Sequence, residues 1–148
     1  MKIRRATLED IPFLCKLLDA LFSQEVEFKP NRESQISGLK AILENEAVGV
    51  IFVAQKESEI FGMINLLYTI STALGGRVAL LEDMVVSSHA RGLGIGSKLI
   101  EYSIKYAKKS GCKRISLLTD ANNCNAQGFY KRHGFEKSSM LSFRKKLL

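Results

Sequence analysis

Apolar residues recur along the chain with two spacings, one typical of strands and the other of helices. Short β-rich runs favour strands at residues 2–6, 48–54, 60–70, 78–86 and 115–119. Apolar positions three and four residues apart predict helices at residues 11–21, 31–43, 92–110 and 123–133. Residues 135–147 have strand character as well. The order strand, two helices, three strands, helix, strand, helix, strand predicts one α/β or α+β domain over residues 1–148.

Polar and glycine residues mark the ends of these elements. Thr7 and Asp10 form an approximate capping box before the first helix, and Asn31 is placed to cap the second. The polar stretch Ser23–Asn31, which contains Glu25 and Glu27, predicts a loop or lid. In the long helix, the spacing turns one set of residues inward: Ile95, Leu99, Ile100, Ser103 and Ala107.

Composition places the chain among ordinary globular proteins. Its 148 residues suit one domain, and 46% hydrophobic with 25% charged residues is close to the average. No apolar run approaches the roughly 20 residues of a membrane span, and the amino terminus lacks the apolar stretch of a signal peptide. Three scattered cysteines (Cys15, Cys112 and Cys124) without a CxxC pair argue against a disulfide framework and a zinc site. We therefore expect a cytoplasmic protein with no metal and no membrane partner.

The formal net charge of +7 is concentrated in the second half of the chain. Residues 1–75 carry 8 Lys or Arg against 10 Asp or Glu, whereas residues 76–148 carry 14 against 5. Such a basic half is compatible with a solvated surface or with the docking of an anionic ligand. Composition alone leaves nucleic acid, a membrane face and a phosphate-rich cofactor as alternatives.

A glycine-rich turn joins the predicted strand 78–86 to the long helix. It reads Arg91-Gly92-Leu93-Gly94-Ile95-Gly96. Glycine leaves no Cβ in the way of a ligand, and the first amides of a helix have no partner within it. These amides and the helix dipole suit a phosphate group, to which Arg91 would add charge-assisted hydrogen bonds. The spacing fits neither a Walker loop nor a GxGxxG fingerprint, and a plain connecting turn is the alternative.

A second motif extends from Asn123 to Phe135, about thirty residues after the glycine-rich turn. Together the two motifs resemble the GNAT superfamily of acetyl-CoA-dependent N-acetyltransferases. Its pyrophosphate signature, Arg/Gln-x-x-Gly-x-Gly/Ala, is matched by Arg91, Gly94 and Gly96. Its second signature, Asn-x-x-Ala-x-x-Phe-Tyr-x-x-x-Gly-Phe, is matched by Asn123, Ala126, Phe129, Tyr130, Gly134 and Phe135. The resemblance covers nearly the whole chain and in motif style is nearest to the polyamine and small-amine acetyltransferases.

The resemblance implies a fold and a cofactor site. The sheet would be mixed, mostly antiparallel and flanked by helices, with its fourth and fifth strands splayed around the pantetheine arm of acetyl-CoA. The arm would be hydrogen-bonded by the backbone of Met84, Val85 and Val86. The pyrophosphate would lie against Arg91, Gly92, Leu93, Gly94, Ile95, Gly96 and Ser97. Asn123 and Asn125 would contact the pantetheine and shape the start of the last helix.

The resemblance also implies direct attack of a primary amine on acetyl-CoA in a ternary complex. An alkyl amine has a pKa near ~10.4 and must lose a proton before it attacks. Glu82 is the candidate base, acting through a water, and Tyr130 matches the tyrosine that gives a proton to the departing thiolate. A salt-bridged strand acid and a buried core tyrosine are the respective structural alternatives. Side chains alternate along a strand, so Glu82 and Asp83 are expected to face opposite ways.

Several alternatives stay open from the sequence. The acceptor would be a small amine, a polyamine or an amino-acid-like compound; a protein N-terminus or lysine is the runner-up. A non-catalytic acetyl-CoA-binding module would need neither Tyr130 nor Glu82, and a nucleic-acid partner ranks last because the aromatics of the basic half fall on apolar faces or in the motif. Only 13 residues follow Phe135. The family's last strand pair is therefore shortened, or one strand is missing or is supplied by a neighbouring subunit of a homodimer.

Overall fold

The structure is a computed structural model that describes residues 1–23 and 30–148. The chain divides into two compact units, Met1–Leu118 and Thr119–Leu148. The predicted lid with Glu25 and Glu27 lies outside the described residues. Within the part that is described, no helix has the length and apolar character needed to cross a membrane.

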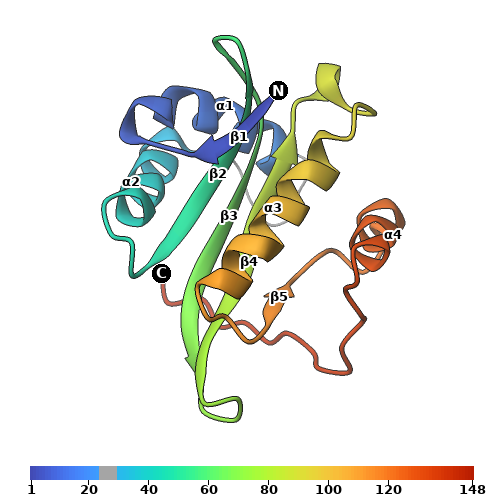
Figure 1. Cartoon of the computed structure of the whole chain (residues 1–148). Helices are drawn as coiled ribbons and strands as arrows, with labels where there is room; N and C mark the ends of the chain where they lie inside the picture. The colour runs from blue at the N-terminus through green and yellow to red at the C-terminus, as the bar shows by residue number, and fades with distance from the viewer. Residues whose placement is uncertain (24–29) are drawn as a thin grey trace. The chain divides into compact units, whose positions relative to one another are not determined.

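The first unit is built on a five-stranded sheet with its strands in chain order (Figure 1). The strands are β1 (Lys2–Arg5), β2 (Gly49–Lys56), β3 (Glu59–Ser71), β4 (Gly76–Val86) and β5 (Ile115–Leu117). The first four pair antiparallel, and β5 runs parallel to β4. This confirms the expected mixed, mostly antiparallel sheet, including the hairpin of its second and third strands.

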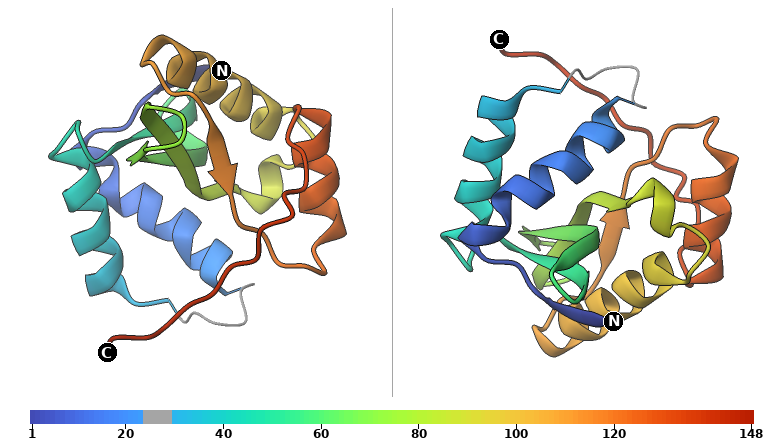
Figure 2. Two further views of the ribbon diagram at one scale, coloured as in Figure 1. Left: turned by 90° about the horizontal axis from the view of Figure 1, so that it is seen from below. Right: turned by 90° about the horizontal axis from the view of Figure 1, so that it is seen from above.

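Helices cover both faces of this sheet (Figure 2). The first helical segments are a short 3-10 turn, η1 (Leu8–Asp10), followed by α1 (Ile11–Phe22) and α2 (Arg32–Leu43). Leu14 of α1 packs in one core cluster with Val53, Met63 and Val85 of the sheet. The other face is covered by α3 (Ile95–Lys109), and Phe52 of β2 contacts the rings of Tyr102 and Tyr106 there. The five residues expected on the inward side of α3 are all buried.

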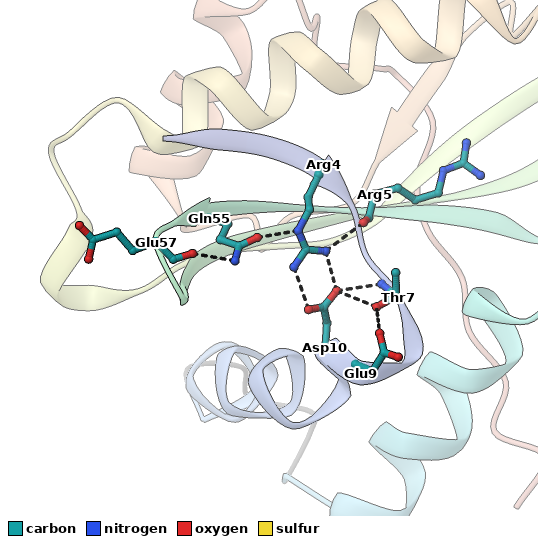
Figure 3. Close-up of polar contacts among 7 residues, drawn as sticks. All are labelled: Arg4, Arg5, Thr7, Glu9, Asp10, Gln55 and Glu57. Carbon is teal, nitrogen blue, oxygen red and sulfur yellow. Dashed lines mark hydrogen bonds and ion pairs between the residues drawn. The ribbon is translucent and has the colours of Figure 1, made fainter.

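A partly buried ion pair fixes the start of the first unit (Figure 3). The Arg4 guanidinium donates hydrogen bonds of 2.8 and 2.9 Å to the two carboxylate oxygens of Asp10, which also accepts the Thr7 backbone N–H at 2.8 Å. The Asp10 side chain is only 8% exposed. The hydrogen bonds from Arg4 lower the pKa of Asp10, while burial opposes this shift. The expected capping box is therefore extended by a cation from β1.

We predict that Asp10→Asn destabilises the protein by about 2 kcal/mol at neutral pH, since a partly buried guanidinium loses its charged acceptor. A carboxyl whose pKa is lowered by folding stabilises the protein above its unfolded pKa and loses that contribution as pH falls through its folded pKa. The difference between wild type and Asp10→Asn in urea unfolding should therefore shrink at acidic pH. A difference that is independent of pH would contradict this assignment.

The second unit contains one helix, α4 (Cys124–Arg132). The Asn123 side chain accepts the Ala126 N–H at 3.1 Å at its start, and Gly134 has a φ of 90° after its end. The prediction of a strand at 135–147 was wrong, because these residues form no strand in the structure. Alternating apolar residues do not make a strand without a hydrogen-bonded neighbour, and Leu141 and Phe143 are 84% and 93% exposed.

Candidate functional site

The fourth strand extends beyond its neighbour β5. The β4–β5 ladder consists of three pairs and ends where Leu81 faces Leu117. From there β4 continues to Val86, still paired with β3 on its other side. The stretch Glu82–Val86 therefore has the geometry to receive an extended ligand as an added strand. It contains Met84, Val85 and Val86, the residues expected to hold a pantetheine arm.

A β-bulge lies at the point where β4 leaves β5. Leu81 pairs with Leu66 and Asp83 with Asn65, so Glu82 is an extra residue on β4. A bulge changes which side chains face each side of a sheet. Val85 and Met63, opposite each other, belong to the core cluster under α1, and strand alternation puts Asp83 and Asn65 on that same face. Glu82 is exposed, whereas Asp83 is partly buried.

Asp83 is held by one side chain of the neighbouring strand. The Asn65 amide donates a hydrogen bond to Asp83 Oδ2 at 2.8 Å, and Asn65 Oδ1 accepts the Asp83 backbone N–H at 2.8 Å. Asn65 itself is 1% exposed. Burial raises the pKa of Asp83 to about 6; the hydrogen bond from Asn65 opposes the shift and the nearby Glu82 charge adds to it. A carboxyl with such a pKa exchanges protons close to neutral pH.

The glycine-rich turn leads from β4 into α3 through a short 3-10 helix, η2 (Ser88–Ala90). Gly92 and Gly94 have φ angles of 84° and 78°, a region that disfavours side chains, and a Cβ at either position would meet no atom within 4 Å. Gly94 is the N-cap of α3 and provides no side chain to cap its first amides. Arg91 and Leu93 are exposed beside it.

These features fit an anionic ligand with an extended arm. The open space over Gly92 and Gly94 allows close approach to the backbone, and the start of a 15-residue helix attracts negative charge. The arm would follow the end of β4, which leads directly into the turn. The first unit thus brings together most of the residues expected to bind the cofactor, Arg91 to Ser97 and Met84 to Val86.

The remaining expected site residues lie in the second unit. Asn123 is the N-cap of α4, and Asn125 is exposed in its first turn. Tyr130 is partly buried in α4, with the rings of Phe129 and Phe135 edge-on at centroid distances of 5.3 and 5.7 Å. Burial raises the pKa of Tyr130, so its hydroxyl is protonated at neutral pH.

Comparison with known proteins identifies the family. The acetyltransferase (GNAT) family matches residues 11–135, which include both motifs. The chain belongs to the GNAT family. It is 33% identical over 143 residues to the uncharacterized N-acetyltransferase YhfO of Bacillus subtilis, covering 94% of this chain and 92% of that protein. It is 28% identical to the aminoalkylphosphonate N-acetyltransferase of Salmonella typhimurium, covering 93% and 86%.

Solved structures agree with this GNAT fold. An integron cassette protein, HFX_CASS3, from a salt-marsh metagenome superimposes with a TM-score of 0.86 and 27% identity, covering 99% of this chain and 90% of that one. The aminoglycoside N-acetyltransferase AAC(6')-Iy, solved in complex with CoA, superimposes with a TM-score of 0.83 over 99% and 95% of the two chains. At 18% identity the latter likeness supports the fold alone. The chain is a GNAT N-acetyltransferase, as its motifs indicated.

Two features of this candidate site were not predicted from the sequence: the bulge at Glu82 and the hydrogen bonds between Asn65 and Asp83. A bulge leaves no clear mark in a sequence, because it depends on the register between two strands. Asn65 did carry a signal, since it is the one amide in the apolar run Gly62–Leu67. A buried amide in such a run requires a hydrogen-bonding partner, and Asp83 is that partner.

Proposed function

We propose that this GNAT protein transfers the acetyl group of acetyl-CoA directly to the primary amine of a small acceptor, within a ternary complex. The observation that carries the proposal is the extension of β4 past β5, continuous with the open turn at Gly92 and Gly94. A strand edge that can bind an extended chain is followed directly in the sequence by a helix start that can bind an anion. These two features match the two parts of acetyl-CoA, the family's co-substrate: its extended pantetheine arm and its pyrophosphate.

The backbone of Met84, Val85 and Val86 holds the arm in this proposal, and one amide there polarises the thioester carbonyl. The pyrophosphate lies against the amides of Gly92–Ser97, with Arg91 adding positive charge. In this proposal Asn123 and Asn125 also contact the arm. We propose residues 1–148 as one N-acetyltransferase domain, because the family match extends over residues 11–135. We propose that the protein works in the cytoplasm, where cysteines stay reduced, as Cys15, Cys112 and Cys124 are here.

Acetyl-CoA supplies an activated acetyl group and a thiolate leaving group. The acceptor nitrogen forms a bond to the acetyl carbon while the carbon–sulfur bond breaks. Glu82, exposed at the bulge, accepts the amine proton through a water, and Tyr130 gives its proton to the leaving sulfur. The products are an acetamide and CoA with its thiol restored. An acceptor that is an ammonium in solution loses one proton to solvent before it attacks, and the proton lost on attack is the one that passes through the water to Glu82. Tyr130, left as a phenolate, regains a proton from Glu82 through solvent, so that both side chains return to their starting states.

The proposed function is tested by two measurements on the purified chain. Calorimetry with CoA should show binding, and thiol release from acetyl-CoA should rise above background with at least one amine of a panel. The panel contains alkyl diamines, aminoalkylphosphonates, aminoglycosides, amino acids and lysine peptides. Absence of CoA binding would refute the proposal. Turnover of peptides alone would favour the runner-up, acetylation of a protein N-terminus or lysine.

We predict that Glu82→Gln lowers kcat about 10²-fold, because a positioned general base typically contributes that much or more. CoA affinity should be unchanged, since the side chain rather than the backbone is altered. Glu44→Gln, an exposed glutamate at the end of α2, is the matched control and should leave kcat unchanged. Equal kcat for Glu82→Gln and wild type would remove Glu82 from the mechanism.

A further inference from the structure

The glycine-rich turn has few packing contacts of its own. Gly92 and Gly94 have open space where a side chain would point, and Leu93 between them is 69% exposed. On one side the turn borders an apolar cleft of about 210 Å³, which Leu93 and Ile95 line together with Phe61 of β3. A side chain beside such a space lacks part of the contacts that fix a packed residue. The position of the turn therefore depends on its two ends, the buried start of α3 and the 3-10 helix η2.

The η2 helix is attached to the first residues of β3. The Ser87 backbone N–H, just before η2, donates a hydrogen bond of 2.7 Å to the Phe61 carbonyl oxygen. The His89 ring lies edge-on to the Phe61 ring at a centroid distance of 5.5 Å. At the end of η2, Ala90 is 1% exposed. The segment that leads into the turn is thus fixed by its contacts with β3.

His89 connects η2 to β3 through both of its ring nitrogens. Its Nδ1 is 2.9 Å from Ser87 Oγ, and its Nε2 is 3.2 Å from Oε1 of Glu59, the first residue of β3. An ionised Glu59 only accepts, so Nε2 carries a proton, while the Ser87 hydroxyl donates to Nδ1 or accepts from it. Both bonds therefore form with the neutral ring and with the imidazolium. We call this pair of bonds the His89 bridge; Arg91 and the turn follow it directly.

The exposure of the His89 bridge determines what it can affect. The side chains of His89 and Glu59 are 62% and 59% exposed, and ion pairs at a surface contribute little to the stability of a whole domain. A turn with few contacts is more sensitive, because loss of a bond at its end frees backbone dihedral angles that phosphate binding then has to order. The bridge should therefore influence ligand binding more than folding.

We propose that His89, bonded to Glu59 and Ser87, is a positioning residue that holds the turn in its phosphate-binding conformation before acetyl-CoA arrives. This proposal rests on the proposed function and adds to it a residue that does not itself touch the cofactor. Amides that are already in place bind an anion more tightly than amides that binding has to order. The His89 bridge therefore raises the affinity for CoA and leaves the chemistry at the thioester to other residues.

Calorimetry and steady-state kinetics on purified full-length variants test this role. His89→Ala should raise the Kd for CoA about 3- to 10-fold, the change expected from loss of one or two hydrogen bonds of modest strength. With any acceptor that wild type acetylates, KM for acetyl-CoA should rise while kcat at saturating acetyl-CoA stays unchanged. His89→Gln keeps an N–H donor for Glu59 and should recover most of the wild-type affinity. An unchanged Kd in His89→Ala, or a lower kcat at saturation, would overturn the proposal.

Two glutamates offer a matched comparison for the partner of His89. Both are exposed and belong to ion pairs of similar length, Glu59 to His89 at 3.2 Å and Glu46 to Arg5 at 3.1 Å. Glu59→Ala should raise the Kd for CoA, and adding it to His89→Ala should have little further effect, because both substitutions remove the same contact. Glu46→Ala should leave Kd unchanged. Additive effects at Glu59 and His89 would overturn the bridge.

Stability measurements separate positioning of the turn from a general loss of structure. The Tm of His89→Ala should fall by no more than about 4 °C, because a surface pair contributes little to unfolding. A larger fall in Tm, with affinity restored by neither His89→Gln nor lower temperature, would assign His89 to the fold alone and overturn the proposal. Failure of wild type to bind CoA would refute the proposed function; normal wild-type binding with an unchanged Kd in His89→Ala would refute the His89 bridge alone.

Discussion

Tyr130→Phe should lower kcat about 10²- to 10³-fold while the Kd for CoA stays within about twofold of the wild-type value. The substitution removes one hydroxyl and keeps the ring between Phe129 and Phe135, so α4 loses little packing. A thiol has a pKa near ~8.5 and a phenol near ~10, so a departing thiolate draws a proton only from a well-placed hydroxyl. Because burial raises the pKa of Tyr130, that proton is present throughout the neutral range.

Tyr68→Phe is the matched control for this experiment. Tyr68 lies in β3, and burial is the largest cause that raises its pKa to about 12, but it has no place in the proposed chemistry. Stopped assays should therefore show normal kcat in Tyr68→Phe and the large loss in Tyr130→Phe. Normal turnover in both variants would point to a different proton donor and would reopen the interpretation of the chain as an acetyl-CoA-binding module.

The sequence predicted most of the first unit because local signals there agree with the tertiary packing. The periodic face of α3 became its buried face, and the Asn31 side chain accepts the Ser34 N–H at 3.0 Å as a cap. The glycine-rich turn could be predicted because its conformation is also determined locally. Gly92 and Gly94 have positive φ angles, which only glycine adopts without strain.

The sequence could not predict features that depend on a second segment of the chain. Phe143 and Leu141 alternate with polar residues as in a strand, yet pairing requires a partner edge, which an alternating pattern does not specify. The bulge at Glu82 depends on register in the same way. The alternation of side chains along a strand predicted that Glu82 and Asp83 face opposite sides of the sheet. It could not predict which of the two is held in place. In the structure Asp83 is held by two hydrogen bonds with Asn65, a residue of the neighbouring strand.

Gly94→Val should weaken CoA binding about 30- to 100-fold, the second large effect that we expect. A side chain at a residue with a φ of 78° destabilises that backbone conformation by about 1–2 kcal/mol. The variant can relieve this strain by rotating the backbone at residue 94. Such rotation turns the first amides of α3 away from a bound phosphate, and each hydrogen bond to a charged group contributes about 1.5–3 kcal/mol. Loss of one such bond accounts for the expected change in Kd, measured by calorimetry.

Gly75→Val distinguishes this local effect from general strain. Gly75 has a φ of 75° and, like Gly94, open space where a Cβ would point, but it lies in the β3–β4 turn at the opposite end of β4 from Val86. Both variants therefore add the same side chain to the same backbone conformation and should lower Tm to a similar extent. Because only one of the two positions begins α3, CoA affinity should fall in Gly94→Val and stay normal in Gly75→Val. Equal loss of affinity in both would mean that strain, rather than the direction of the α3 amides, controls binding, and the phosphate would then have to be sought elsewhere on the basic half of the chain.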